Sequence, residues 1–316
     1  MTYKGSTQRA ELGPYAHEKQ MPSWLREMLE KSTKVTQPSR ISSRGRLRKP
    51  ETAANETADI IPTLARLCSM DKSVRRALLC SPKVCQISKL PREGSFCGYR
   101  NIQMMISYIK EAGIPGNDRF PDSLPTILEL QNMIEQAWDM GYNSVGREET
   151  GGIRGTRKYI GTSEAQALFR SLGIQCETCS IGETQEVRAY DALLASIASY
   201  FRQEFSPDKN DKVLVTSLPP IYFQHQGHSL TIIGFEIRDN GSANLLVLDP
   251  MFKPPPVVEH GKETYSKFHD PTQTLKGYRR GTDYLRKYKL FEILNQLEHV
   301  DLRYVECSVF GNNKML

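Results

Sequence analysis

The sequence contains no long apolar run. None of its apolar stretches approaches the roughly 18 residues that a membrane-spanning helix needs, and the N-terminus, MTYKGSTQRAELGPY, lacks the apolar core of a secretory signal peptide. We therefore expect an intracellular protein without a membrane contact, in the cytoplasm, the nucleus or both. The seven cysteines fit this expectation, because an odd and irregularly spaced set in 316 residues is not a disulfide framework.

Several binding motifs are also missing. Residues 1–96 lack the Cys/Cys…His/His spacing of a zinc finger. The Cys-x-x-Cys at 176–179 has no second pair, and His225 and His228 have no evident third ligand, so we predict no metal site. The glycine-rich stretch 141–161 lacks the Gly-Lys-Ser/Thr ending of a phosphate-binding loop. We expect that stretch to be a mobile loop beside a functional site instead.

Basic charge is scarce outside the N-terminal tail. Residues 1–56 contain 11 Lys and Arg against 6 Asp and Glu, which accounts for +5 of the net charge of +6. The rest of the chain is nearly neutral, so composition does not support a nucleic-acid-binding face there. The basic segment 40–49 is open to two interpretations, a nuclear-localisation signal or a solvated linker.

The tail of residues 1–56 is polar and short of aliphatic side chains, and we predict that it is mostly disordered. The exception is PSWLREMLEK at 22–31, where Pro and Ser suit a helix start. Its apolar side chains would share one face: Trp24, Leu25, Met28 and Leu29. Such a helix either docks on the globular part of its own chain or binds a partner.

Residues 57–316 form the predicted globular domain. Helical periodicity is found at 60–80, 97–112, 125–140, 162–172, 187–205 and 282–298. Strand patterns are found at 212–217, 221–224, 229–237, 244–249 and 302–309. The Asn240-Gly241 pair indicates a hairpin between the third and fourth of these strands. Because a helical part precedes a mainly antiparallel sheet, the predicted fold class is α+β.

Cys97 opens a predicted helix in GSFCGYRNIQMMISYI, residues 94–109. Free backbone N–H groups and the macrodipole at a helix start favour a thiolate, and the same groups can stabilise an oxyanion. The position alone also suits a buried structural cysteine. The apolar residues that anchor this helix in the core are Ile102, Met105, Ile106 and Ile109.

A nucleophilic cysteine needs a base, and the histidines of PPIYFQHQGHSLTIIGFE are well placed to supply one. His225 and His228 lie on a turn between two apolar strands, and a histidine that begins a buried strand is held rigidly. The next strand ends in Asp249, which the hairpin brings next to His228, where it can orient the imidazole. The order Cys97, His228, Asp249 is that of papain-like cysteine peptidases.

Four blocks of the chain, within residues 60–310 and in the same order, resemble a known family. GSFCGYRNIQMM, GTRKYIGTSEAQALFRSLGI, PPIYFQHQGHSLTIIGFE and LLVLDP are similar to the ubiquitin-fold-modifier (UFM1) peptidase family, and within it to the zinc-finger branch that acts on ubiquitin. The resemblance implies a papain-like fold, with Cys97 as nucleophile, His228 as base and Asp249 as its orienting carboxylate. It also implies that the Gln224 side chain donates to the oxyanion.

The resemblance further implies a cysteine-type deubiquitinase, a thiol isopeptidase that cuts at the C-terminal glycine of ubiquitin. Ubiquitin or polyubiquitin is then the partner, no cofactor is needed, and we expect a monomer. Two other functions stay open. One is a peptidase for UFM1 or another ubiquitin-like modifier, and the other is a non-catalytic ubiquitin-binding module of the same fold.

Two departures from the family pattern bear on the substrate. UFM1-processing enzymes carry their catalytic histidine two residues after the aspartate, where this chain has Met251, and this favours ubiquitin over UFM1. The zinc fingers of animal members have no counterpart in residues 1–96. Trp138, Tyr159 and Glu164 are candidates to line a channel for the substrate tail, although Trp138 suits the core equally well.

Overall fold

The structure is a computed structural model that describes residues 12–31, 40–41, 47–48, 55–204, 211–259 and 270–296. Three features of the sequence analysis lie outside these residues. They are most of the 40–49 segment, the predicted strand over 302–309, and three of the six histidines (His260, His269 and His299).

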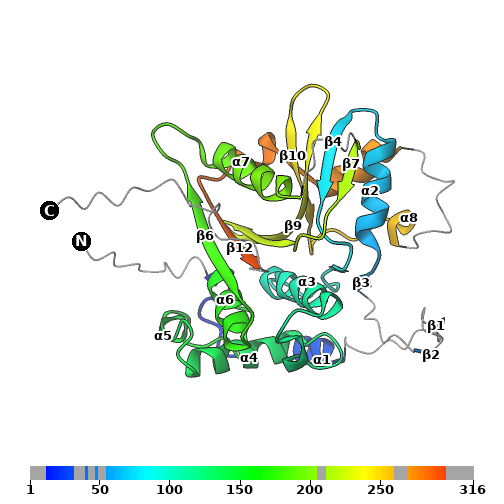
Figure 1. The fold of residues 1–316 in the computed structure, drawn as a ribbon. Coiled ribbons are helices and arrows are strands. Elements are labelled where there is room, and N and C mark those ends of the chain that lie inside the picture. Colours follow the sequence, from blue (N-terminus) through cyan, green and yellow to red (C-terminus); the bar gives the residue numbers. More distant parts are fainter. Residues whose placement is uncertain are drawn as a thin grey trace.

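An eight-stranded, mainly antiparallel sheet forms the centre of the molecule (Figure 1). Its order is β11–β10–β9–β8–β12–β6; β4 also pairs with β9, and β7 pairs with β4 in parallel. The strands are β4 (Val74–Leu79), β6 (Cys176–Gly182), β7 (Val213–Val215), β8 (Ile221–His225), β9 (His228–Arg238), β10 (Ala243–Leu248), β11 (Arg279–Gly281) and β12 (Leu290–Gln296). Two small sheets pair β1 (Arg40–Ile41) with β2 (Leu47–Arg48) and β3 (Glu56–Thr57) with β5 (Gln86–Ile87).

Helices cover the sheet, and one of them lies at the heart of the molecule (Figure 1). Helix α3 (Cys97–Ala112) packs on β9 and separates the sheet from a helical layer. That layer contains α1 (Ser23–Lys31), α4 (Ile127–Asp139), α5 (Val145–Thr150) and α6 (Thr162–Ser171). Helix α7 (Ala189–Arg202) packs on β9 and β10, and α2 (Ile60–Met70) packs on β4 and β7. The short helices are η2 (Asn117–Arg119), α8 (Pro256–Glu259), α9 (Pro271–Leu275), η4 (Lys276–Tyr278) and α10 (Thr282–Leu285). The α+β class is confirmed.

Helix α3 is buried on every side over Cys97–Ile109. The sequence predicts one apolar face in the core, but the helix lies between the sheet and the helical layer, so its polar side chains are buried too. Arg100 pairs with Glu93 at 2.6 Å, and both side chains are less than 5% exposed. Buried charges are tolerated when they are paired in this way. The helix that carries Cys97 is thus fixed within the core.

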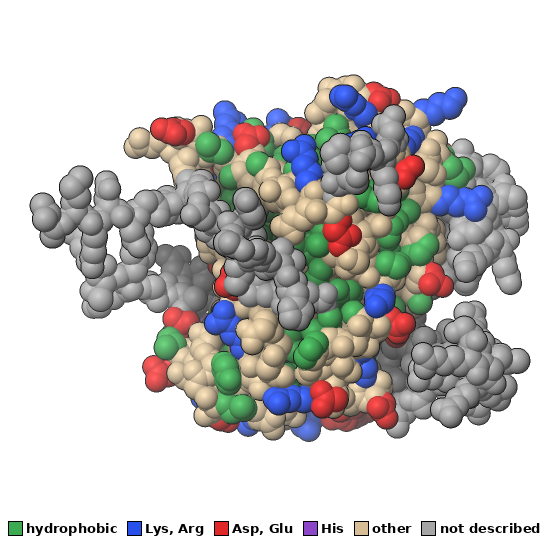
Figure 2. Space-filling model, viewed as in Figure 1, with side chains coloured by type: hydrophobic (Ala, Val, Ile, Leu, Met, Phe, Trp, Pro, Cys, Tyr) green, Lys and Arg blue, Asp and Glu red, His purple; other side chains and the backbone are tan. Residues whose placement is uncertain are grey.

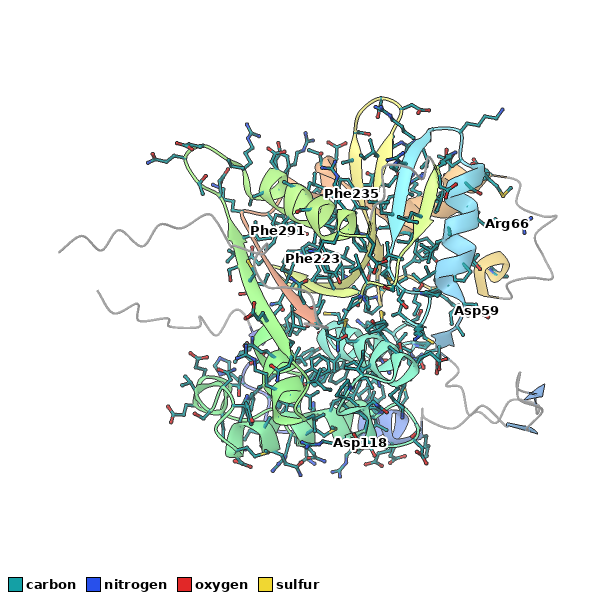
Figure 3. All side chains as sticks on the ribbon, in the orientation of Figure 1. Asp59, Arg66, Asp118, Phe223, Phe235 and Phe291 are labelled. Atoms are coloured by element: carbon teal, nitrogen blue, oxygen red, sulfur yellow. The ribbon has the colours of Figure 1, made fainter. Side chains whose placement is uncertain are left out.

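Strand β9 joins most of the sheet together. Its first half pairs with β8 and its second half with β4 along one edge, and β10 pairs along the other. The predicted Asn240-Gly241 hairpin between β9 and β10 is confirmed, with Gly241 at a φ of 81°. Phe223 of β8 and Phe291 of β12 pack on each other, with ring centroids 5.7 Å apart, in the middle of the sheet (Figure 3).

Two predicted helices are wrong in part. The span 60–80 is helix α2 followed by strand β4, since Asp71 ends the helix and its carboxylate accepts from Ser73. Of the span 282–298, the described residues 282–296 contain the short α10 followed by β12, a central strand between β8 and β6. In both cases the apolar pattern of the residues fits a helix as well as a strand, and pairing with neighbouring strands decides for the strand.

The structure has a helix, α1, within residues 22–31, and it packs against α4. Leu25 and Leu29 are buried, together with Met21 just before the helix, whereas Trp24 is 51% exposed. Docking on its own chain is therefore the interpretation that the structure supports, and Trp24 does not share the buried face. The predicted tail of residues 1–56 is ordered at least over 12–31.

The surface carries charges of both signs. On the face seen in Figure 2, Lys and Arg side chains alternate with Asp and Glu and do not gather into a basic stripe among the described residues. Within the described part of the chain, no helix combines the length and the apolar character needed to cross a membrane.

Candidate active site

The candidate nucleophile is the first residue of the central helix. Cys97 follows Phe96, the N-cap residue, whose side chain makes no capping hydrogen bond. The amide groups of the first turn are therefore not used up by a side-chain cap, which leaves the partial positive charge of the helix start near the thiol. Cys97 is 8% exposed.

The candidate base is fixed by a tight hairpin. Strands β8 and β9 are joined by Gln226 and Gly227, and His225 and His228 form the pair that closes the turn. Gly227 has a φ of 79°, a backbone conformation that glycine adopts without strain. Because β9 begins directly after the turn, His228 is the first residue of a largely buried strand.

Asp249 follows β10 and meets His228 as the sequence predicts. The Nε2 of His228 donates to Oδ1 of Asp249 at 2.9 Å. The same Oδ1 accepts from the backbone N–H of Met251 at 2.8 Å, and Oδ2 accepts from Nη2 of Arg280 at 2.7 Å. Since Nε2 is engaged by the carboxylate, Nδ1 is the ring nitrogen left to face Cys97.

The electrostatics distinguish Cys97 from the other cysteines. Burial raises the pKa of Cys97, but a hydrogen bond and the charge of His228, with the backbone N–H of Ser229 and the charge of Lys89, outweigh burial and lower it. Burial raises the pKa of the other cysteines with a resolved shift: Cys68, Cys80, Cys85 and Cys176. A lowered pKa marks a thiolate nucleophile, whereas a raised one is typical of inert structural cysteines.

The two histidines of the hairpin have opposite shifts. Burial lowers the pKa of His228, yet hydrogen bonds and charges from Asp249 and Cys97 raise it overall to about 9. Burial lowers the pKa of His225 to about 4, with a contribution from the charge of His228. At neutral pH the site therefore holds an imidazolium at His228 and a neutral His225 behind it, and the lowered pKa of Cys97 favours its thiolate form.

Gln224 lies on β8, opposite Ser229, at the edge of the site. Its side chain packs directly on Gly161, where a Cβ would lie 2.5 Å from Oε1 of Gln224. Gly98, next to the nucleophile, is just as close to Ile160, whose carbonyl oxygen would be 2.7 Å from a Cβ on Gly98. The segment Ile160–Gly161, which we call the wall, thus packs on the residue that follows Cys97 and on the Gln224 side chain. The stretch 141–161, predicted as a loop, contains helix α5 at Val145–Thr150, and its last two residues reach the candidate site.

The three predicted channel residues have different surroundings. Trp138 is 2% exposed and packs under Gly146 in the core, which contradicts its placement on a channel wall. Trp138 is a core residue because its large indole fills the space between α4 and α5. Glu164 is buried in α6, and its carboxylate accepts from the backbone N–H of Gly161 at 2.8 Å. Tyr159 is half-buried, with its ring over Gly13.

Two residues that support the site are missed by the sequence analysis. Asn101 lies one turn after Cys97, and its amide donates to the carbonyls of Cys97 and Ser229, both at 2.8 Å. It thereby ties the nucleophile's helix to the base's strand, and a buried asparagine in an apolar helix is the signal that points to it. Arg280 on β11 holds Asp249, but it lies next to a span predicted as helix, and no local pattern marks it.

With this geometry in view, the similarity to known proteins is informative. Residues 73–294 match the model of peptidase family C78. The chain belongs to peptidase family C78. The C78 match includes Cys97, His228, Asp249 and Gln224, and it ends just before the last residues of β12. The family match and the geometry therefore agree on an α+β fold that carries the active site of a cysteine-type peptidase.

Two relatives of this chain have names that mention ubiquitin. The chain is 36% identical over 203 residues to the human protein named zinc finger-containing ubiquitin peptidase 1, and the match covers 62% of this chain and 34% of that protein. It is 32% identical over 156 residues to the Schizosaccharomyces pombe protein named ubiquitin carboxyl-terminal hydrolase mug105, covering 49% and 59%. The chain thus spans about a third of the human relative. A crystal structure of UfSP from C. elegans is similar with a TM-score of 0.47 and 16% identity, over 84% of this chain and 42% of that one.

Proposed function

We propose that this chain is a cysteine-type deubiquitinase, which hydrolyses isopeptide or peptide bonds at the C-terminal glycine of ubiquitin. The observation that carries the proposal is the joined set Cys97, His228 and Asp249, in which the carboxylate orients the imidazole and the imidazole lowers the pKa of the thiol. A set of this kind supports nucleophilic acyl transfer.

The reaction would follow from the charges in the site. The thiolate of Cys97 attacks the carbonyl carbon of the scissile bond, and the negative charge moves to the carbonyl oxygen. Backbone N–H groups at the start of α3 and the side-chain amide of Gln224 are the donors proposed to stabilise that oxyanion. His228, protonated at neutral pH, gives its proton to the departing amine, which leaves a thioester on Cys97.

Hydrolysis of the thioester uses the same groups in the opposite sense. His228, now neutral, takes a proton from water, and the resulting hydroxide attacks the thioester carbonyl. The carboxylate product leaves and Cys97 returns to the thiolate. Asp249 remains ionised throughout, because His228, Met251 and Arg280 all hydrogen-bond to it and keep its pKa low.

Two observations support ubiquitin as the modifier. Both relatives reported above have ubiquitin in their names. In addition, Met251 occupies the position two residues after Asp249, and its side chain is 64% exposed, so it takes no part in the triad. The base comes from β9 instead.

The test is labelling with modifier-derived suicide probes. The full chain is incubated with ubiquitin carrying a C-terminal propargyl group and, separately, with the matching UFM1 probe. We expect a covalent adduct with the ubiquitin probe that Cys97→Ala abolishes. Labelling by the UFM1 probe alone would reassign the modifier, and labelling by neither probe, with no cleavage of di-ubiquitin, would support a non-catalytic binding module.

A further inference from the structure

The wall formed by Ile160 and Gly161 limits the space in which a substrate's peptide backbone can meet the candidate site. Ile160 lies against Gly98 beside the nucleophile, and Gly161 lies against the Gln224 amide. A Cβ on Gly98 or on Gly161 would overlap its neighbour, so neither position has room for a side chain. If the wall moved outward, the substrate's reacting carbonyl would no longer be held at a fixed position relative to the Gln224 amide.

Helix α6 holds the wall itself, since Glu164 accepts from the backbone N–H of Gly161 at 2.8 Å, and two further parts of the molecule hold the loop that leads to it. Helix α4 holds the first half. Glu135 accepts from the backbone N–H groups of residues 153 and 154 at 2.8 and 3.0 Å, and Gln131 accepts from Gly155 at 2.8 Å and donates to the carbonyl of Thr156 at 2.8 Å. Among the described residues, the α4 hydrogen bonds to this loop end at Thr156, four residues before the wall.

The second half is held by residues 12–22, which we call the N-terminal segment. The carboxylate of Glu18 accepts three hydrogen bonds from Arg157, from the backbone N–H at 2.7 Å, from Nε at 2.9 Å and from Nη2 at 2.5 Å. The guanidinium of Arg157 also lies 3.6 Å from the ring centroid of Tyr15. The backbone N–H of Tyr159 donates to the carbonyl of Leu12 at 3.0 Å.

The Glu18–Arg157 pair is built differently from the exposed pairs of this region. Its side chains are 11% and 20% exposed, whereas Glu27 and Lys31 on α1 form a 3.5 Å pair with exposures of 63% and 79%. Two guanidinium donors on one carboxylate oxygen and a backbone N–H on the other fix the geometry, while an exposed pair of long side chains contributes little. The N-terminal segment therefore fixes residues 157–159 in place.

We infer that Glu18 and Arg157 are positioning residues, through which the N-terminal segment sets the Ile160–Gly161 wall for the C-terminal tail of the modifier. The inference rests on the proposed function, since it concerns how that tail is received. The family match begins at residue 73, so the N-terminal segment lies outside the matched region. The segment is an element of this chain that completes a site made from the family's own strands and helices.

The test compares the reactions of Cys97 with a large and a small electrophile in the full chain. Glu18→Ala removes all three hydrogen bonds to Arg157, and Glu18→Gln keeps one acceptor oxygen. Glu27→Ala is the matched control, because it removes an exposed carboxylate from the same region. Each variant is labelled with the propargyl probe that labels the wild-type chain, ubiquitin or UFM1, and separately with iodoacetamide.

We expect Glu18→Ala to slow probe labelling by about tenfold or more, because small displacements of substrate-positioning groups have large effects on rate. Glu18→Gln should fall between Glu18→Ala and wild type, and Glu27→Ala should match wild type. Iodoacetamide, which needs no wall, should alkylate Cys97 at an unchanged rate in every variant.

Three outcomes would overturn the inference. Unchanged probe labelling of Glu18→Ala would mean that the N-terminal segment only packs on the loop. Faster labelling would mean that it obstructs the substrate. Equal losses of probe labelling and of alkylation, in Glu18→Gln as well, would show a general structural role. Because the probe is the one that wild type accepts, an error in the choice of modifier changes the proposed function and leaves this comparison intact.

Discussion

The hydrogen bond from His228 to Asp249 makes a quantitative prediction for the variant Asp249→Asn. The asparagine oxygen can still accept from Nε2 of His228, so the ring orientation is retained, but the negative charge is lost. The variant therefore separates the charge of Asp249 from its role in orienting the imidazole.

The size of the effect follows from the pKa of His228. Burial lowers it, and partners raise it from the ordinary value of 6.5 to about 9. A rise of this size corresponds to about 3 kcal/mol in favour of the imidazolium. The hydrogen bond and the charge of Asp249 both contribute to this rise, and the charge is lost in the variant. We expect the pKa of His228 to fall by on the order of one unit, which is about 1.4 kcal/mol and about tenfold in the equilibrium between imidazolium and imidazole.

The assay is the pH dependence of kcat/KM with a fluorogenic ubiquitin substrate. In wild type the basic limb should lie near the pKa of His228, about 9, because loss of that proton removes the acid that protonates the leaving amine. In Asp249→Asn we expect this limb to move down by about one pH unit and kcat/KM at pH 7 to fall by about tenfold or more.

The control is Asp239→Asn, an exposed aspartate at the far end of the same β9–β10 hairpin. It makes the same replacement of a carboxylate by an amide away from the site, so its pH profile should match that of wild type. If the basic limb of Asp249→Asn stayed in place while its activity fell, Asp249 would act by geometry alone and the electrostatic reasoning would be refuted.

Three further predictions test the surroundings of the triad. Arg280→Met leaves one oxygen of Asp249 without its donor, so kcat/KM should fall and Arg280→Lys should restore part of it, as measured with the same substrate. Gln224→Ala should reduce kcat with little change in KM in steady-state kinetics, because an oxyanion donor acts in the transition state, at a typical cost of about 10²-fold. The pKa of His225 is lowered from 6.5 to about 4, so its neutral form contributes stability that is complete above pH 6.5 and is lost as pH falls toward 4. Urea unfolding of His225→Phe should therefore show a flatter loss of stability than wild type between pH 6.5 and 4, and equal slopes would contradict this account.

The triad could be predicted from sequence because local signals place its members. Cys97 opens a strongly periodic helix, and the Asn240-Gly241 turn fixes which strand ends meet. Once a hairpin is given, the start of one strand and the end of the next lie at the same edge of the sheet. The hairpin thus predicts that His228 and Asp249 are neighbours, and a register shift between Leu246 and Val247 brings Asp249 one residue closer to His228.

The rest of the site depends on contacts that no local pattern encodes. Arg280 reaches Asp249 from β11, and β12 has a sequence whose apolar spacing also fits a helix. The N-terminal segment has almost no apolar periodicity, and an ion pair with a residue 139 positions away holds it in place. Such contacts are decided by tertiary packing, which is why the sequence predicts a mostly disordered tail and leaves Trp138 open between a channel wall and the core.

The hairpin shows how one short element can give two histidines opposite tasks. His225 and His228 are the two ends of the same turn, with ring centroids 6.0 Å apart, yet the pKa of one is lowered to about 4 and that of the other is raised to about 9. His228 faces the carboxylate of Asp249, whereas His225 stacks on Tyr288 at 3.8 Å and meets the hydroxyl of Tyr284 at 2.5 Å.

The separation of these two pKa values helps the reaction. Two cationic imidazoles so close together would repel each other, and a charged His225 would lower the pKa of His228 and weaken its pairing with Cys97. Arg280 strengthens the separation, since its positive charge also lowers the pKa of His225 while its guanidinium holds Asp249 for His228. A neutral, stacked His225 thus supports the turn rigidly, and the positive charge of this histidine pair is kept at His228, the ring that faces the nucleophile.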